Sequence, residues 1–191
     1  MRLVLATNNP HKVKEIRKIL PESFELLDLK QAGVTEELPE TSGTIEGNAI
    51  QKALRVWELT GMQCVADDSG LEVEVLGGKP GVDSAHFAGL PRNDARNVIF
   101  LLDQLEGVQN RRAGFRTVLA YVQNGEVFTF EGTVQGVISN AQRGTGGFGY
   151  DPVFVPEGYE KSFAELPAEV KNSISHRANA LKLFHDFIVK R

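Results

Sequence analysis

The sequence has little of what disulfide-stabilised, membrane-spanning or extended nucleic-acid-binding proteins need. Cys64 is the single cysteine among 191 residues, so no internal disulfide can form, and we expect a reducing, cytoplasmic location. The longest clearly apolar runs, such as 98–102, are far shorter than the ~20 residues that cross a bilayer. No long basic run occurs and the net charge is −4. We therefore expect no membrane or nucleic-acid partner, whereas a small anion bound by a few placed cations remains compatible.

What is present indicates a globular chain of mixed helices and strands. Hydrophobic residues make up 41%, which suits a single domain, or a single domain in two lobes, over residues 1–191. Apolar spacing predicts helices over 12–20, 44–60, 93–105 and 175–190, and strands over 3–6, 24–29, 64–66 and 71–75. The turn Asn124-Gly125, between runs 115–123 and 126–134, predicts a β-hairpin. This mixture predicts an α/β or α+β protein with a mixed sheet.

A first polar cluster, Thr7-Asn8-Asn9-Pro10-His11-Lys12, joins a short strand to a helix. Backbone N–H groups and the partial positive charge at a helix start favour anions, and Lys12 adds a full charge. The cluster therefore suits phosphate binding. An ordinary strand–helix turn with a solvated lysine is the simpler interpretation of this cluster alone, because the glycine pattern of a P-loop is absent.

Acidic residues form the second candidate site. Asp67 and Asp68 follow a buried strand in Asp67-Asp68-Ser69-Gly70, a predicted turn, where carboxylates are costly unless they bind a cation or accept hydrogen bonds. Such an acid can hold Mg²⁺ or act as a general base, and capping the turn is an equally good interpretation of the motif alone. Glu40, in an acidic loop, and Lys52, on a helix, could reach this turn or be surface charges.

Glycines and aromatics mark the third candidate site, in residues 144–152. Glycines let a chain approach a ligand closely, Phe148 and Tyr150 could stack on a base, and Asp151 could bind its edge. A long connector is the alternative interpretation. Further on, Ser175 as an N-cap would place His176 and Arg177 in the first turn of the last helix, where they either bind ligand or are solvated.

Together and in this order, the segments resemble the inosine triphosphate pyrophosphatase family, also called the Ham1-like or non-canonical purine NTP pyrophosphatases. The matching segments are 5–9 with Lys12, 40–41, 48–49 with 52–53, 66–71, 76–78 with 80–81, 144–152, and Lys171 with 174–177. The resemblance implies an elongated α/β fold of two lobes around a central cleft, a homodimer and a Mg²⁺ requirement. It also implies hydrolysis of ITP, dITP and XTP to the monophosphate and pyrophosphate, a house-cleaning reaction that keeps these nucleotides out of DNA and RNA.

The resemblance also assigns residues by position. Asp68 would activate water, Asp67 and Lys52 would support it as catalytic residues, and Glu40 with Asp68 would bind the metal. The implied substrate-binding residues are Thr7, Asn8, Asn9, Pro10, His11 and Lys12 for the triphosphate, Ser69 in contact with the substrate, and Phe148, Gly149, Tyr150, Asp151, Lys171, His176 and Arg177 around base and sugar. Two positions depart from the family pattern: Gly47 stands where a glutamate is frequent, and His86 replaces an arginine with a weaker, titratable cation.

Three other functions remain open. A pyrophosphatase for modified pyrimidines, like the distantly similar Maf proteins, would use the same chemistry. A nucleotide sensor would need no water-activating acid, so Glu40, Lys52 and Asp68 argue against it. The triplet Asp68-Ser69-Gly70 also occurs in aspartic proteases, but here it occurs once, and the cationic and glycine-rich clusters would then have no role.

Overall fold

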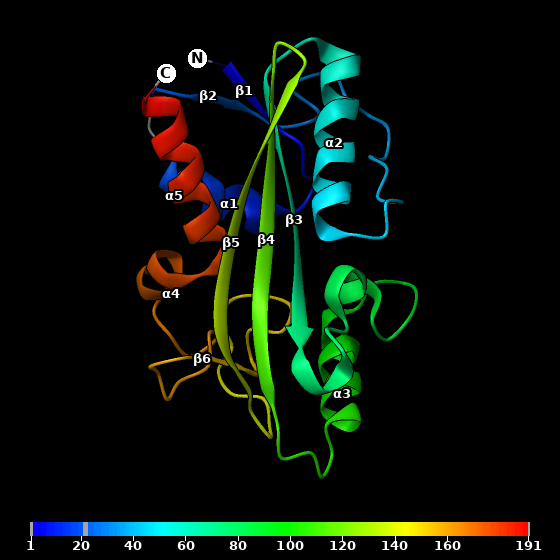
Figure 1. Ribbon diagram of the computed structural model, residues 1–191, viewed down its shortest axis with the longest axis vertical. Coiled ribbons are helices and arrows are strands. Elements are labelled where there is room, and N and C mark those ends of the chain that lie inside the picture. Colours follow the sequence, from blue (N-terminus) through cyan, green and yellow to red (C-terminus); the bar gives the residue numbers. More distant parts are fainter. Residues whose placement is uncertain (1, 21–22, 191) are drawn as a thin grey trace. The chain divides into compact units, whose positions relative to one another are not determined.

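The computed structural model, drawn in Figure 1, describes residues 2–20 and 23–190, and the chain divides into two compact units. Unit 1 comprises Met1–Asp68, Thr117–Gly132 and Arg177–Arg191, and unit 2 comprises Ser69–Arg116 and Thr133–His176. The described helices are α1 (Pro10–Ile19), α2 (Ile45–Thr60), α3 (Asp94–Gln104), α4 (Ala168–Ile174) and α5 (His176–Val189), with 3₁₀ turns at Glu74–Leu76 and Gly81–His86. None of the helices within residues 2–20 and 23–190 is both long and apolar enough to cross a membrane.

The described strands form one mixed sheet, which confirms the predicted α/β class. They are β1 (Arg2–Leu5), β2 (Glu25–Leu27), β3 (Cys64–Val73), β4 (Arg112–Gln123), β5 (Glu126–Ile138) and β6 (Phe154–Pro156). Their order is β2-β1-β3-β4-β5-β6; β1 is parallel to both β2 and β3, and β5 is antiparallel to β6. Residues of β3, β4 and β5 belong to both units.

In unit 1, the helix ends follow from local capping. Helix α1 begins two residues before its predicted start, because the Asn9 side chain accepts hydrogen bonds from the backbone of His11 (3.0 Å) and Lys12 (3.4 Å). Pro10 at the first helical position loses no hydrogen bond there. Helix α2 matches its prediction: the Thr44 hydroxyl caps its start, and Gly61, at φ 64°, ends it.

The core of unit 1 fixes the end of β1 beside the start of β3. Buried apolar side chains come from strand, helix and C-terminal segments: Leu3, Leu5, Ile16, Leu20, Val65, Leu119, Tyr121, Ala180, Leu181 and Phe184. Leu5 pairs with Val65 in the sheet, and the Ala6 N–H donates to the Val65 carbonyl at 2.8 Å. Thr7 therefore follows β1 next to the point where β3 carries Asp67.

The prediction of a turn at residues 67–70 was wrong, because β3 continues without a break to Val73. The strand continues because the side chains of Asp67 and Asp68 form ion pairs with lysines of other segments. The Leu71 N–H also donates to the Ser84 hydroxyl at 2.9 Å. The predicted strand 71–75 is correspondingly shorter, because a 3₁₀ turn begins at Glu74 and Gly77 follows it at φ 64°.

The predicted hairpin is confirmed: Asn124 (φ 52°) and Gly125 (φ 81°) connect β4 to β5. Both strands extend several residues beyond their predicted outer ends. Strand β6 and helix α4 had no prediction, because a three-residue strand and a seven-residue helix carry too little periodicity.

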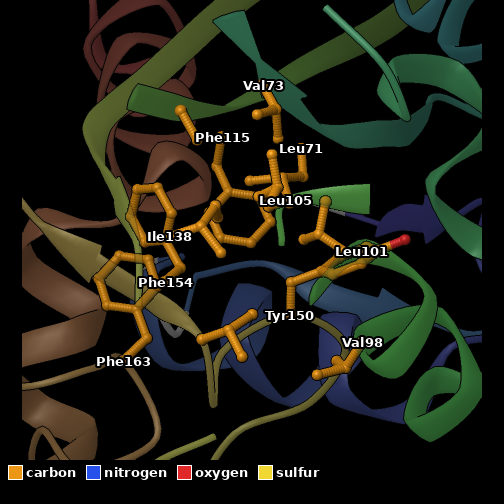
Figure 2. Packing of buried hydrophobic residues seen from close by; sticks show 12 residues of the cluster. Leu71, Val73, Val98, Leu101, Leu105, Phe115, Ile138, Tyr150, Phe154 and Phe163 are labelled. Carbon is orange, nitrogen blue, oxygen red and sulfur yellow. The ribbon is translucent and has the colours of Figure 1, made fainter. Parts of the chain in front are cut away.

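The core of unit 2 packs α3 against the strands and the glycine-rich loop (Figure 2). The labelled side chains are Leu71, Val73, Val98, Leu101, Leu105, Phe115, Ile138, Tyr150, Phe154 and Phe163. The Phe115 and Phe154 rings meet edge to face with centroids 4.7 Å apart. Tyr150 adds a polar tie, because its hydroxyl donates to the Ser84 carbonyl at 2.9 Å.

Helix α3 offers a matched test of this core. Leu101 is fully buried, whereas Ile99 on the same helix is 53% exposed. We expect Leu101→Ala to lower the free energy of unfolding by ~2–5 kcal/mol through lost burial and a cavity, and Ile99→Ala to change it by less than ~0.5 kcal/mol. Urea denaturation of both variants measures this, and equal midpoints would contradict the packing described for α3.

Candidate active site

Unit 1 gathers charged side chains from five segments into what we call the acid–cation group. Its members come from α1, the loop before α2, α2 itself, β3 and the start of α5; they are Lys12, Glu40, Lys52, Asp67, Asp68 and Arg177. The sequence predicted each of them as a site residue. The structure brings them together within a single unit.

Lys52 is the centre of one half of this group. Its ammonium donates to the Glu40 carboxylate (2.5 Å), to Asp68 Oδ1 (3.2 Å) and to the backbone carbonyl of Asp67 (2.8 Å). The side chain lies on the buried face of α2, where the small side chains of Ala49 and Ala53 share the helix face. Two carboxylates are thus held around one cationic point.

The loop that carries Glu40 is fastened to α2 by paired hydrogen bonds. The Thr41 N–H donates to Gln51 Oε1, and Gln51 Nε2 donates back to the Thr41 hydroxyl, both at 2.9 Å. The Ser42 N–H and hydroxyl both donate to Asn48 Oδ1, at 3.1 and 2.9 Å. Glu40 is therefore placed beside Lys52 although its side chain is 51% exposed.

Asn48 and Gly47 have positional roles that the prediction of site residues omitted. Asn48 also donates to Asp68 Oδ2 at 3.5 Å, so it connects the Glu40 loop to the second carboxylate. A Cβ on Gly47 would lie 2.4 Å from the Ser42 hydroxyl oxygen. The absence of a side chain at this departure from the family pattern therefore allows the loop to approach α2 closely.

Asp67 is the centre of the other half. Its Oδ2 lies 3.1 Å from Lys12 Nζ and accepts a hydrogen bond from Arg177 Nε at 3.1 Å. Arg177 also pairs with Glu15 on α1. Sequence reasoning missed Glu15, because an acid one turn after Lys12 on an amphipathic helix carries no signal until α5 is packed against it.

Burial and neighbouring charge separate the two adjacent carboxyls. Burial alone would raise the pKa of Asp67, but the charges of Lys12, Arg177 and Lys52 together outweigh it and hold the pKa below its ordinary value. Burial raises the pKa of Asp68, and Lys52 and Lys12 only partly offset it. Asp67 is thus a fixed anion, and Asp68 is the better proton acceptor of the two.

The pKa values of Lys12 and Lys52 are also shifted in opposite directions. Burial lowers the pKa of Lys12 despite the attraction of Asp67, and the neighbouring Lys52 adds to that effect. Burial acts on Lys52 in the same sense, but Asp68, Glu40 and Asp67 outweigh it and raise the pKa. Lys52 therefore remains a cation across the physiological range.

Unit 2 holds a second group in the glycine-rich loop. Asp151 Oδ2 accepts hydrogen bonds from the Phe148 N–H (2.7 Å) and from Lys171 Nζ (2.6 Å), and Lys171 lies 4.9 Å from the centre of the Phe148 ring. Gly147, at φ 72°, is required here, because a Cβ would lie 1.9 Å from Asp151 Oδ2. This loop is therefore an ordered structure and not a loose connector.

Two side chains of this region are anchored in the core of unit 2. Tyr150 is buried and bonded to Ser84, and His176 stacks on Phe115 with ring centroids 4.7 Å apart. The Gly149 N–H donates to Asp94 Oδ2 at 3.2 Å, a contact for which the sequence offered no signal. Phe148 is half-buried and is the more accessible aromatic of the loop.

Helix α5 begins at His176, so His176 and Arg177 lie in its first turn as predicted, and Ser175 stands directly before it and also ends α4. Its N–H donates to the Lys171 carbonyl at 2.9 Å, and α5 begins at the next residue. The short helix α4 places Lys171 beside Asp151.

The remaining predicted residues are distributed between the units. Those that precede or begin α1 are in unit 1, and the Thr7 hydroxyl accepts a hydrogen bond from the Asn9 N–H at 3.2 Å. Three further predicted residues at this helix start are exposed: Asn8, Pro10 and His11. Ser69, half-buried on β3, and the exposed His86 belong to unit 2.

Comparisons with known proteins identify the family of the chain. A model of the Ham1 family matches residues 3–187. The chain is 50% identical over 189 residues to the dITP/XTP pyrophosphatase of Porphyromonas gingivalis, covering 98% of this chain and 97% of that protein. It is 45% identical over 183 residues to the dITP/XTP pyrophosphatase of Bacillus subtilis, covering 94% and 92%. The solved Ham1 protein of Staphylococcus aureus matches with a TM-score of 0.92 at 36% identity, covering 100% of this chain and 99% of that one. The chain therefore belongs to the Ham1 family.

Proposed function

We propose that this protein is a nucleoside-triphosphate pyrophosphatase that hydrolyses the non-canonical purine nucleotides ITP, dITP and XTP to the monophosphate and pyrophosphate. The names of its relatives, dITP/XTP pyrophosphatases at 45–50% identity, support the substrate class. The observation that carries the proposal is the ammonium of Lys52 held between Glu40 and Asp68. Removing such triphosphates would keep them out of DNA and RNA.

The cations of the acid–cation group suit the phosphate end of the substrate. A triphosphate is strongly anionic, and Lys12 and Lys52 are positioned by Asp67 and Asp68 of β3, beside the point where the parallel strand β1 ends. The start of α1 adds backbone N–H groups of partial positive charge. We propose that Thr7 through Lys12, with Lys52, bind the triphosphate and stabilise the charge that develops on the departing pyrophosphate.

The donor set fits a bound Mg²⁺ ion. Glu40 and Asp68 both contact Lys52 Nζ, so their oxygens converge on one region, and carboxylate oxygens are the ligands that Mg²⁺ prefers. Such a pair suits Mg²⁺, which is usually held by one or two carboxylates together with substrate phosphates, where it neutralises phosphate charge.

We propose that Asp68 orients and deprotonates the water that attacks the α-phosphorus. Its raised pKa makes it a stronger base than an ordinary aspartate, and hydrogen bonds from Lys52 and Asn48 fix both carboxylate oxygens. Asp67, with its lowered pKa, instead holds Lys12 and Arg177 in position. The two neighbouring acids would therefore divide catalysis and positioning.

The group in unit 2 suits recognition of the base and sugar. Hypoxanthine and xanthine carry a 6-oxo group where adenine carries an amine, so a donor aimed at that oxygen is left unpaired by adenine. The Phe148 and Gly149 amides already donate to Asp151 and Asp94. We propose that Lys171 and His176 supply the donors and that Phe148 stacks on the base, with Ser69, Gly149, Tyr150, Asp151 and Arg177 in contact or in support.

We also propose a cytoplasmic homodimer, on the strength of the family resemblance. One chain has a mass of 21.0 kDa. Light scattering of the purified protein is expected to give about twice that mass, and a single-chain mass at all concentrations would contradict the dimer.

A substrate panel tests the activity. With Mg²⁺, we expect rapid release of pyrophosphate from ITP, dITP and XTP, and little from ATP, GTP, dUTP or modified pyrimidine triphosphates. EDTA should abolish turnover and excess Mg²⁺ should restore it, because the phosphate charge must be neutralised. Phosphate release instead of pyrophosphate would refute the proposed bond, and preference for modified pyrimidines would refute the proposed base.

Asp68→Asn tests the proposed base. The amide keeps the shape but cannot accept the proton, so kcat should fall by about 10²–10⁴-fold while the fold is retained. Asp103→Asn, at an exposed position on α3, removes the same charge and should leave kcat unchanged. Turnover by Asp68→Asn at the level of this control would exclude Asp68 as the base.

A further inference from the structure

Unit 1 contains a second concentration of cations, on the side of α1 opposite Lys12. An open pocket of about 600 Å³ lies there, and we call it the basic pocket for its lining residues Lys14, Arg17, Lys18 and Lys30. Because successive helical residues are about 100° apart, the three on α1 lie roughly 140–240° around the helix from Lys12. The basic pocket and the acid–cation group therefore use opposite faces of α1, and the segment that precedes and begins α1, with Thr7, Asn8 and Pro10, borders both the pocket and the proposed triphosphate site.

The pocket lies where parallel strands commonly bind ligands. Strands β1 and β2 are adjacent and parallel, and the segments that follow them, with Thr7 and Asn8 after β1 and Leu29 and Lys30 after β2, line the pocket together. Ligands of such sheets bind outside the carboxyl ends of the strands, and the main crevice lies where the strand order reverses, which here is between β1 and β3. The acid–cation group uses the other neighbour of β1, strand β3.

The charges of the basic pocket are not neutralised by the surrounding protein. Within residues 2–20 and 23–190, none of its four cations forms an ion pair. Asp28 is the one acid among the described lining residues, and its carboxylate accepts the Gln31 N–H at 2.7 Å while the Gln31 side chain accepts the Asp28 N–H at 2.9 Å. Glu15 on α1 is turned to Arg177. An anion in the pocket would therefore meet a clear excess of positive charge.

We propose that the basic pocket binds an oligophosphate, either free pyrophosphate or the triphosphate of a second nucleotide. Its volume suits a small molecule, and several convergent lysines with an arginine are typical of phosphate recognition. Val13, which also lines it, adds a partly buried apolar side chain. The inference does not depend on the proposed catalysis, because binding is measured without turnover.

The test is a titration of ¹⁵N-labelled full-length protein with pyrophosphate in EDTA. The amides of Leu29 and Lys30 should shift and saturate, since they line the basic pocket and are remote in sequence from Lys12. Lys14→Ala/Lys18→Ala should raise the dissociation constant read from these amides about tenfold, and added salt should raise it further. Lys182→Ala/Lys190→Ala removes the same charge from exposed positions of unit 1 and should not alter it.

Three results would overturn the inference: no saturable shift of these amides, an unchanged constant in Lys14→Ala/Lys18→Ala, or equal weakening in both double variants, which would indicate general charge attraction. A parallel titration with an α,β-methylene purine triphosphate separates the two ligand sources. Tighter binding of this analogue than of pyrophosphate identifies a nucleotide as the ligand, and the reverse identifies pyrophosphate.

Discussion

The buried carboxylate of Asp67 is the contact on which the acid–cation group depends. It lies on β3 with 1% of its surface exposed, and its cost of desolvation is offset by Lys12 and Arg177 on either side. Removing one partner from a buried pair of this kind costs about 3–5 kcal/mol, because the charge that remains is buried without a partner and without water to solvate it. Through these contacts Asp67 joins β3 to α1 and α5, and the positions of both cations follow from it.

The neighbour of Asp67 shows how one strand can give two acids different properties. Side chains alternate along β3, so Asp68 turns to another set of partners, Lys52 and Asn48, and meets less positive charge. The same strand therefore carries a permanently ionised anchor and a carboxyl whose pKa is raised. Pairs of catalytic acids commonly have pKa values that their environments push apart, so that one carboxyl can accept a proton while the other stays ionised.

Much of the fold was predictable where local chemistry decides it. The cap Thr44 and the stop Gly61 delimit α2, and Asn124-Gly125 makes a tight hairpin, because these residues act on their immediate neighbours. The prediction failed at residues 67–70, which have the composition of a turn but form part of β3. Cations from distant segments supply the partners that a turn would have supplied, and no local pattern reveals them.

The candidate site divides in the same way. By itself the sequence determined which residue types are available, and their order identified the family: a lysine after a strand–helix turn, paired acids, and a glycine-rich loop with an aromatic. Only the tertiary structure decided that Arg177 belongs with Asp67 and Glu15, that Asn48 joins the Glu40 loop to Asp68, and that Asp94 binds the amide of Gly149. These contacts join residues far apart in the chain, and the free energy of burying their charges and amides exists only once the elements are packed.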